Sequence, residues 1–148
     1  MRSVLDTATR SELINRIDQL TENNKAQWGH MNVCQMVKHC TRWEEMALGK
    51  RKYKQVFIGR IFGKIALRTV LKDEEPLRKN SPSVRDFVIT ENGGDIETEK
   101  KKWIAVIEEY GQLSNPDFIH PFFGKMSEQQ IGQMAYKHID HHLRQFNG

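Results

Sequence analysis

The sequence predicts an all-α protein, and residues 1–148 are expected to fold as a single domain. Apolar residues recur three and four positions apart in several segments, which is the spacing of one buried helix face. The alternating pattern of β-strands is nearly absent. Long amphipathic helices with little strand bury their apolar faces most simply as a helical bundle.

Capping pairs mark where three of these helices begin. In each pair, a Ser, Thr or Asn is followed three positions later by Glu or Gln, so the two side chains can bond the free backbone amides of the first turn. A further helix is expected over residues 95–112, because helical spacing continues until Asn115-Pro116. The three capped helices are 9–24 with Thr9 and Glu12, 32–48 with Asn32 and Gln35, and 127–146 with Ser127 and Gln130.

A fifth helix is predicted in the middle of the chain, over residues 55–71, where apolar residues again recur at helical spacing. Basic side chains fall four residues apart along it, at Arg60, Lys64, Arg68 and Lys72. We interpret this basic stripe as a solvated face, with a membrane-surface helix as the alternative.

The segment that follows, residues 73–94, has no helical pattern. It contains Pro and Gly residues and one run that looks extended, 87–90. A loop of this length in a compact domain is usually a functional wall or lid, or is simply mobile.

Composition restricts the function classes. The net charge is +4 with a pI near 9.1, and acids lie close to the basic clusters, so we expect a solvated surface rather than a nucleic-acid site. The longest apolar run, Trp103–Ile107, is far shorter than the ~20 residues that span a bilayer, and no membrane partner is expected. The N-terminus has no signal-peptide core, and Cys34 and Cys40 lack zinc-ribbon or redox spacing. A cytoplasmic protein with reduced thiols is therefore predicted.

Three of the six histidines lie within five residues near the end of the chain. On a helix, His138 and His142 stand one turn apart, about 6 Å along the axis, and both fall within the apolar stripe of Ile131 and Ala135. We therefore expect both rings to point into the bundle. His141 lies on the flank, and the opposite side carries charges that we expect to face water: Lys137, Asp140 and Arg144.

A further imidazole belongs to the second helix. His39 follows the spacing of that helix's apolar residues and so borders its buried face. Three neutral imidazoles that converge on one divalent metal ion leave coordination positions open for water or substrate, as in catalytic zinc sites. A single inward histidine is more often a hydrogen-bonded core residue than a metal ligand, and it is the pair at four-residue spacing together with His39 that favours a metal site.

Two motifs resemble a known family. The segment 28–40 leads into the second helix, and HPFFG at 120–124 precedes the helix that carries KHxDHHLRQF at 137–146. Together they resemble the DinB/YfiT-like superfamily, and the resemblance covers nearly the whole chain. It implies a four-helix bundle with a long crossover, containing the extra helix, between helices 2 and 3.

The resemblance also implies a metal site and a chemistry. The metal triad of the superfamily, one His on the second helix and two on the last, matches His39, His138 and His142, with zinc or nickel as the divalent ion. Characterised relatives include thiol-dependent transferases, so a small-molecule substrate, with low-molecular-weight thiols as candidates, is implied. Bundles of this kind often pair through helix faces, which leaves a homodimer open.

Neighbouring residues receive less specific roles. His120 is a candidate catalytic residue that would line the pocket mouth or supply a proton, and the equal alternative is that it hydrogen-bonds its own turn. Asp140 is expected to be a surface or capping residue, and Trp28, Trp43 and Trp103 are expected in the core. Two functions remain open. One is a metalloenzyme that activates water or a thiol for transfer or hydrolysis, and the other is a non-catalytic binding or scaffold bundle with a structural or vestigial histidine site.

Overall fold

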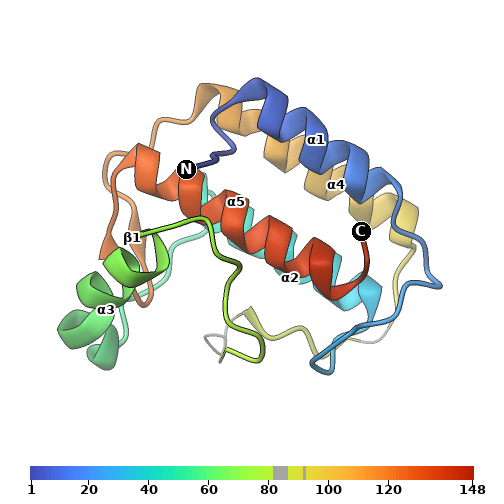
Figure 1. The fold of residues 1–148 in the computed structure, drawn as a ribbon, viewed down its shortest axis with the longest axis horizontal. Helices are drawn as coiled ribbons and strands as arrows, with labels where there is room; N and C mark the ends of the chain where they lie inside the picture. Colours follow the sequence, from blue (N-terminus) through green and yellow to red (C-terminus); the bar gives the residue numbers. More distant parts are fainter. Residues whose placement is uncertain (82–86, 92) are drawn as a thin grey trace.

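The computed structural model describes residues 1–81, 87–91 and 93–148. Within these ranges five α-helices dominate and strands are almost absent, which confirms the predicted all-α class (Figure 1). The helices are α1 (Thr7–Asp18), α2 (Val33–Ala47), α3 (Phe57–Val70), α4 (Ile96–Glu108) and α5 (Glu128–Gln145), and a 3₁₀ turn, η2 (Glu109–Gln112), continues α4.

Four of the helices share one core. α2 packs against α4 and α5, and α1 packs against the same two helices. α2 and α5 run in opposite directions, so residues near the middle of each meet (Figure 1). The shared core is apolar and includes fully buried side chains from three of these helices and from η2: Leu13, Met36, Tyr110 and Ile139.

The fifth helix, α3, lies in the segment between α2 and α4, where an extra helix is predicted. It stands to one side of the other helices, beside a short hairpin (Figure 1). The hairpin consists of β1 (Ile119–His120) and β2 (Gly124–Lys125), which pair antiparallel with His120 opposite Gly124. The HPFFG motif thus forms the turn on which α3 rests.

The start and end of α1 differ from the prediction. Asp6 rather than Thr9 caps the helix, because the Asp6 carboxylate accepts the backbone N–H of Thr9 at 2.8 Å. The helix ends at Asp18, before a local turn in which the backbone N–H of Thr21 donates to Asn24 Oδ1. The other two predicted capping boxes are both present: Asn32 with Gln35, and Ser127 with Gln130.

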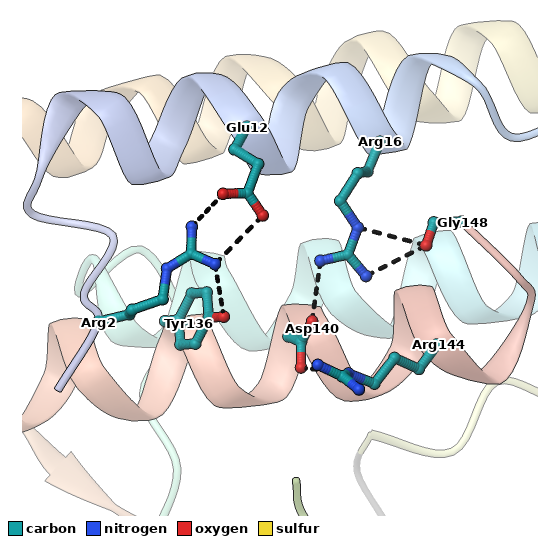
Figure 2. Close-up of polar contacts among 7 residues, drawn as sticks. All are labelled: Arg2, Glu12, Arg16, Tyr136, Asp140, Arg144 and Gly148. Carbon is teal, nitrogen blue, oxygen red and sulfur yellow. Dashed lines mark hydrogen bonds and ion pairs between the residues drawn. The ribbon is translucent and has the colours of Figure 1, made fainter. Parts of the chain in front are cut away.

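Lys137 and Asp140, on the outer face of α5, are buried, so the expectation that these two charges face water is wrong, whereas Arg144 is exposed as expected. The Asp140 carboxylate accepts hydrogen bonds from Arg16 of α1 at 2.8 Å and from Arg144 at 2.7 Å (Figure 2). The Lys137 ammonium donates to the carbonyl of Val70, at the end of α3, at 2.6 Å. A buried charge is tolerated when partners replace its water, and here the partners come from α1, from α3 and from α5 itself.

The predicted helix α3 is confirmed, but its apolar stripe faces outward. Gly59 and Gly63 lie against the backbone of Phe122, where a Cβ on either glycine would overlap the Phe122 carbonyl. Leu67 is the large apolar side chain that α3 buries. The helix therefore approaches the hairpin through its smallest residues, and its bulky apolar residues are left exposed: Phe57, Ile58, Ile61, Phe62 and Ile65.

The segment predicted as a wall or lid is described only in part, since residues 82–86 and 92 lie outside the described ranges. Its extended-looking run forms no strand in the described residues, although Phe87 and Ile89 are buried and Val88 is exposed. Among the described residues, no helix has the length and apolar content needed to cross a membrane.

Candidate metal centre

Three buried histidines meet between α2 and α5. One nitrogen from each of His39, His138 and His142 lies within 4.8 Å of the other two, a grouping that could hold a metal ion. The two histidines of α5 come from successive turns of its inner face, and His39 comes from the middle of the antiparallel α2. The structure thus brings together the three residues that the sequence predicts as metal ligands.

Hydrogen bonds turn two of these rings so that Nε2 points inward. The Nδ1–H group of His39 donates to the Phe87 carbonyl at 2.9 Å. His142 Nδ1 lies 2.8 Å from Oε1 of Gln145, whose Nε2 donates to the Trp28 carbonyl at 2.7 Å. Since that donation fixes the orientation of the amide, Oε1 accepts and His142 Nδ1 carries the proton. Metal-binding histidines usually donate their second N–H in this way.

The distance between two of the inward nitrogens suits a metal. His39 Nε2 and His138 Nε2 are 3.2 Å apart. Two nitrogens that each bind a tetrahedral zinc ion at about 2.05 Å lie roughly 3.3 Å from one another. The donor set fits as well, because imidazole nitrogen is a good ligand for both zinc and nickel.

The third ring has a buried carboxylate behind it. His138 Nδ1 has no hydrogen-bond partner, and neither has Glu44 Oε1, which lies 3.8 Å away. The other carboxylate oxygen of Glu44 accepts the Tyr110 hydroxyl hydrogen bond. Glu44 is fully buried, and burial raises its pKa well above the usual range. An unpartnered donor and acceptor so close together indicate a contact that a small ring rotation would complete.

Burial keeps all three imidazoles neutral near pH 7. It lowers the pKa of His142 to about 3 and that of His138 well below the ordinary value, with the neighbouring histidines adding to both effects. Burial also lowers the pKa of His39, which the hydrogen bond to Phe87 partly offsets. Neutral imidazoles present lone pairs, which a metal ion requires.

The histidine group opens onto a cavity of about 580 Å³. His39 and His142 form part of its wall, and Trp28, which is half-buried rather than in the core as predicted, forms another part. His141 also lines it, with its ring 5.3 Å from that of Trp28. The described lining residues include no Asp, Glu, Lys or Arg. Trp43 and Trp103 are buried, as predicted.

His120 lies apart from the triad and from this cavity. Its Nδ1 accepts the backbone N–H groups of Phe122 and Phe123 at 3.1 and 3.2 Å, so it closes its own turn. The Trp43 ring lies between His120 and the triad. Its centroid is 4.9 Å from that of His138, on which it stacks, and 6.1 Å from that of His120. The catalytic role assigned to His120 from the sequence stays a prediction, whereas its structural role is visible.

Sequence reasoning missed the residues that orient the ligands. Gln145 lies three residues after His142, a spacing that places both on one helix face and that could have identified it. Glu44 follows Cys40 by one turn within the buried face of α2, where an acid is unusual. The Phe87 carbonyl could not have been found, because a backbone group leaves no mark in the sequence.

A comparison with known protein families identifies the family of this chain. The family model described as "Protein of unknown function (DUF1569)" matches residues 2–148. No curated protein and no solved structure matches the chain. Because the family model covers nearly the whole sequence, the protein belongs to the DUF1569 family.

Proposed function

We propose that this protein is a metal-dependent enzyme in which His39, His138 and His142 hold one divalent ion, zinc or nickel. The observation that carries the proposal is the convergence of three neutral imidazoles, two of which, His39 and His142, line a cavity. A ligand set that opens to a cavity is typical of catalytic sites, whereas structural zinc sites are closed by a fourth protein ligand.

The proposed fold is a four-helix bundle of the DinB/YfiT-like kind, formed by α1, α2, α4 and α5. The pairwise contacts among these helices support it, and so does the position of α3 between α2 and α4. In such bundles, metal sites are built in the interior from side chains on facing helices.

When bound, the ion would supply Lewis acidity, which lowers the pKa of a coordinating water or thiol towards neutrality. The chain's own residues prepare the site for it. Phe87 and Gln145 hold two rings with Nε2 inward, and Glu44 offers His138 Nδ1 an acceptor. Because the three rings are buried and two of them line the cavity, the cavity is the side from which substrate would reach the ion in the described part of the chain.

We propose a low-molecular-weight thiol as the substrate, for transfer or hydrolysis chemistry. The resemblance of the end motifs to DinB/YfiT-like proteins supports this class. The cavity supports it independently, because its described walls are uncharged and the ion would be the fixed charge facing it. An ionisable sulfur is a ligand that such an ion favours.

The experiment that tests the metal site is elemental mass spectrometry on protein purified without a histidine tag. We expect close to one divalent ion per chain, and loss of that ion in a His138→Ala/His142→Ala variant. His30→Ala is the matched control, because His30 lines the same cavity but is exposed and outside the triad. Protein that stays empty after incubation with zinc and nickel would contradict the proposal.

A non-catalytic scaffold with a structural histidine site is the second candidate, and His39→Ala separates the two. In an enzyme this change abolishes turnover of thiol-transfer or hydrolysis substrates with little effect on the melting temperature. In a structural site it lowers the melting temperature sharply, because the bound metal contributes folding free energy.

A further inference from the structure

The outward face of α3 carries most of the exposed large hydrophobic side chains of the described residues. Among the described residues, five of the eight large hydrophobic side chains that are exposed belong to this one helix. Phe57, near its start, is 77% exposed, and Ile65, two turns later, is 64% exposed. Monomeric proteins rarely leave such residues contiguous unless the surface binds something. We call this surface the α3 face, formed by Phe57, Ile58, Ile61, Phe62 and Ile65.

The α3 face is a firmly held feature. The hairpin accepts the glycine side of the helix, and the backbone N–H of Val56 donates to the Pro121 carbonyl at 2.8 Å just before the first turn. At the other end, Lys137 of α5 bonds the Val70 carbonyl. Rotating α3 to bury its bulky residues would break these contacts, so they hold the helix with the α3 face exposed.

Basic side chains lie along one edge of the α3 face. On a helical wheel, Arg60 and Lys64 fall between the buried glycine side and the apolar residues, and Arg68 falls just inside the same edge, beside Phe57. All three are exposed. Residues 57–70 contain no Asp or Glu. The Lys64 ammonium donates to the Lys125 carbonyl of the hairpin, whereas Arg60 and Arg68 can lay their stems along the apolar surface while their charges reach outward.

This charge pattern decides what would cover the face. A second copy placed antiparallel on α3 would bring two sets of three basic residues together with no acidic residue of α3 between them, which is unfavourable. A bilayer that contains anionic lipids offers acyl chains to the apolar residues and phosphates to the basic edge. The helix has 14 residues and so is about 21 Å long, which lets it lie in the interface but not span the membrane.

We propose that the α3 face docks this protein on anionic phospholipid surfaces. α3 lies in the plane of the interface, with Phe57, Phe62 and Ile65 inserted at the boundary of the acyl chains. The proposal does not depend on the metal site, and it selects the membrane-surface alternative over the solvated face expected from the sequence.

Vesicle flotation tests it on the full chain. With vesicles of equal parts phosphatidylcholine and phosphatidylglycerol at low salt, we expect the protein to float, and with pure phosphatidylcholine we expect it to remain below. Phe57→Ser/Phe62→Ser should abolish flotation without lowering the melting temperature, because both side chains are exposed. Arg60→Glu/Lys64→Glu/Arg68→Glu should weaken binding by about a hundredfold.

The matched control reverses three exposed basic residues elsewhere: Lys25→Glu, Arg78→Glu and Lys101→Glu. It carries the same change in net charge and should retain most of the binding. Failure of the parent protein to float would overturn the proposal, and so would equal weakening by the control. Sedimentation analysis supplies a further test, because a dimer that dissociates in Phe57→Ser/Phe62→Ser, without flotation of the parent, would assign the face to a second copy.

Discussion

α5 and α3 are both amphipathic helices, yet they bury opposite kinds of residue. α5 turns two histidines inward and even buries Asp140 on its other side. α3 turns Phe57 and Phe62 outward and buries two glycines. Hydrophobicity alone therefore does not decide which face of a helix is buried.

The difference has a physical cause in each helix. Around α5, polar groups find partners: Phe87 and Gln145 for the histidines, and Arg16 for Asp140. A buried polar group is tolerated when it is hydrogen-bonded. Around α3, the hairpin backbone comes so close that only residues without a side chain fit against it. The glycine side of α3 therefore packs against the hairpin, because the steric overlap of a larger side chain there costs more free energy than leaving the apolar side chains of α3 exposed.

Truncating one isoleucine on each helix gives the largest expected contrast. Ile139 of α5 is fully buried, and Ile139→Ala should lower the free energy of unfolding by about 2–5 kcal/mol. Ile61 of α3 is 54% exposed, and Ile61→Ala should change the free energy of unfolding by less than about 0.5 kcal/mol. Urea unfolding measures both. Equal losses would break the comparison, since they would mean that Ile61 is buried in solution.

Filling the glycine side of α3 sharpens the comparison from the other direction. In Gly63→Leu the new side chain must displace the backbone of the hairpin, and we expect a loss of about 3 kcal/mol despite the better helix propensity of Leu. Thr69→Leu, at an exposed position of the same helix, is the control and should be nearly neutral. Unfolding in urea reports the difference, and a neutral Gly63→Leu would show that α3 does not need this close contact.

Removing the carboxylate behind His138 tests the polar interior of α5. Glu44→Gln keeps the shape of the side chain but weakens the acceptor for Nδ1–H, so metal affinity should fall about 10–100-fold. Titration with zinc against a competing chelator measures the affinity. Glu45→Gln makes the same change one residue later on α2, away from the triad, and should leave the metal affinity unaltered. Equal affinities for the parent and Glu44→Gln would mean that Glu44 serves Tyr110 alone.

His120 provides the smallest expected effect, and it depends on pH. Burial lowers the pKa of His120 from 6.5 to about 4. Between these two pH values His120 is therefore protonated in the unfolded chain but stays neutral in the folded protein. This costs stability progressively as the pH falls from 6.5 to 4, by about 2 kcal/mol at pH 5. Asn cannot titrate, but its Oδ1 can accept the same backbone N–H groups.

His120→Asn should therefore lose less stability than the parent between pH 7 and pH 5, as measured by urea unfolding at both values. The triad titrates in both proteins, so its contribution cancels. His30→Asn, at an exposed histidine, should follow the parent. Identical losses in His120→Asn and the parent would show that His120 is not held neutral by burial.

Much of this could be predicted from the sequence because it depends on local patterns. Capping pairs are short-range, and Asn32 with Gln35 and Ser127 with Gln130 behave as expected. The inward direction of His138 and His142 follows from their spacing relative to Ile131. The start of α1 was misplaced because Asp6 and Thr9 are both good caps, and spacing alone does not choose between them.

The remainder depended on partners that are distant in the chain. Asp140 looked like a surface residue because its partner Arg16 lies 124 residues away. Phe87 enters the candidate metal centre through a backbone carbonyl, which any residue would supply. No local pattern encodes either contact.

The sequence by itself determined the helical class, most helix boundaries and the candidate ligands His39, His138 and His142, because periodicity and capping act within a few residues. Only the tertiary structure decided that the outer side of α5 is buried as well, how Gln145 and Glu44 support the triad, and that α3 presents its apolar side outward. Those outcomes depend on which surfaces pack together and how closely. The sequence of one helix gives the size and charge of its side chains but does not specify which distant element packs against each face.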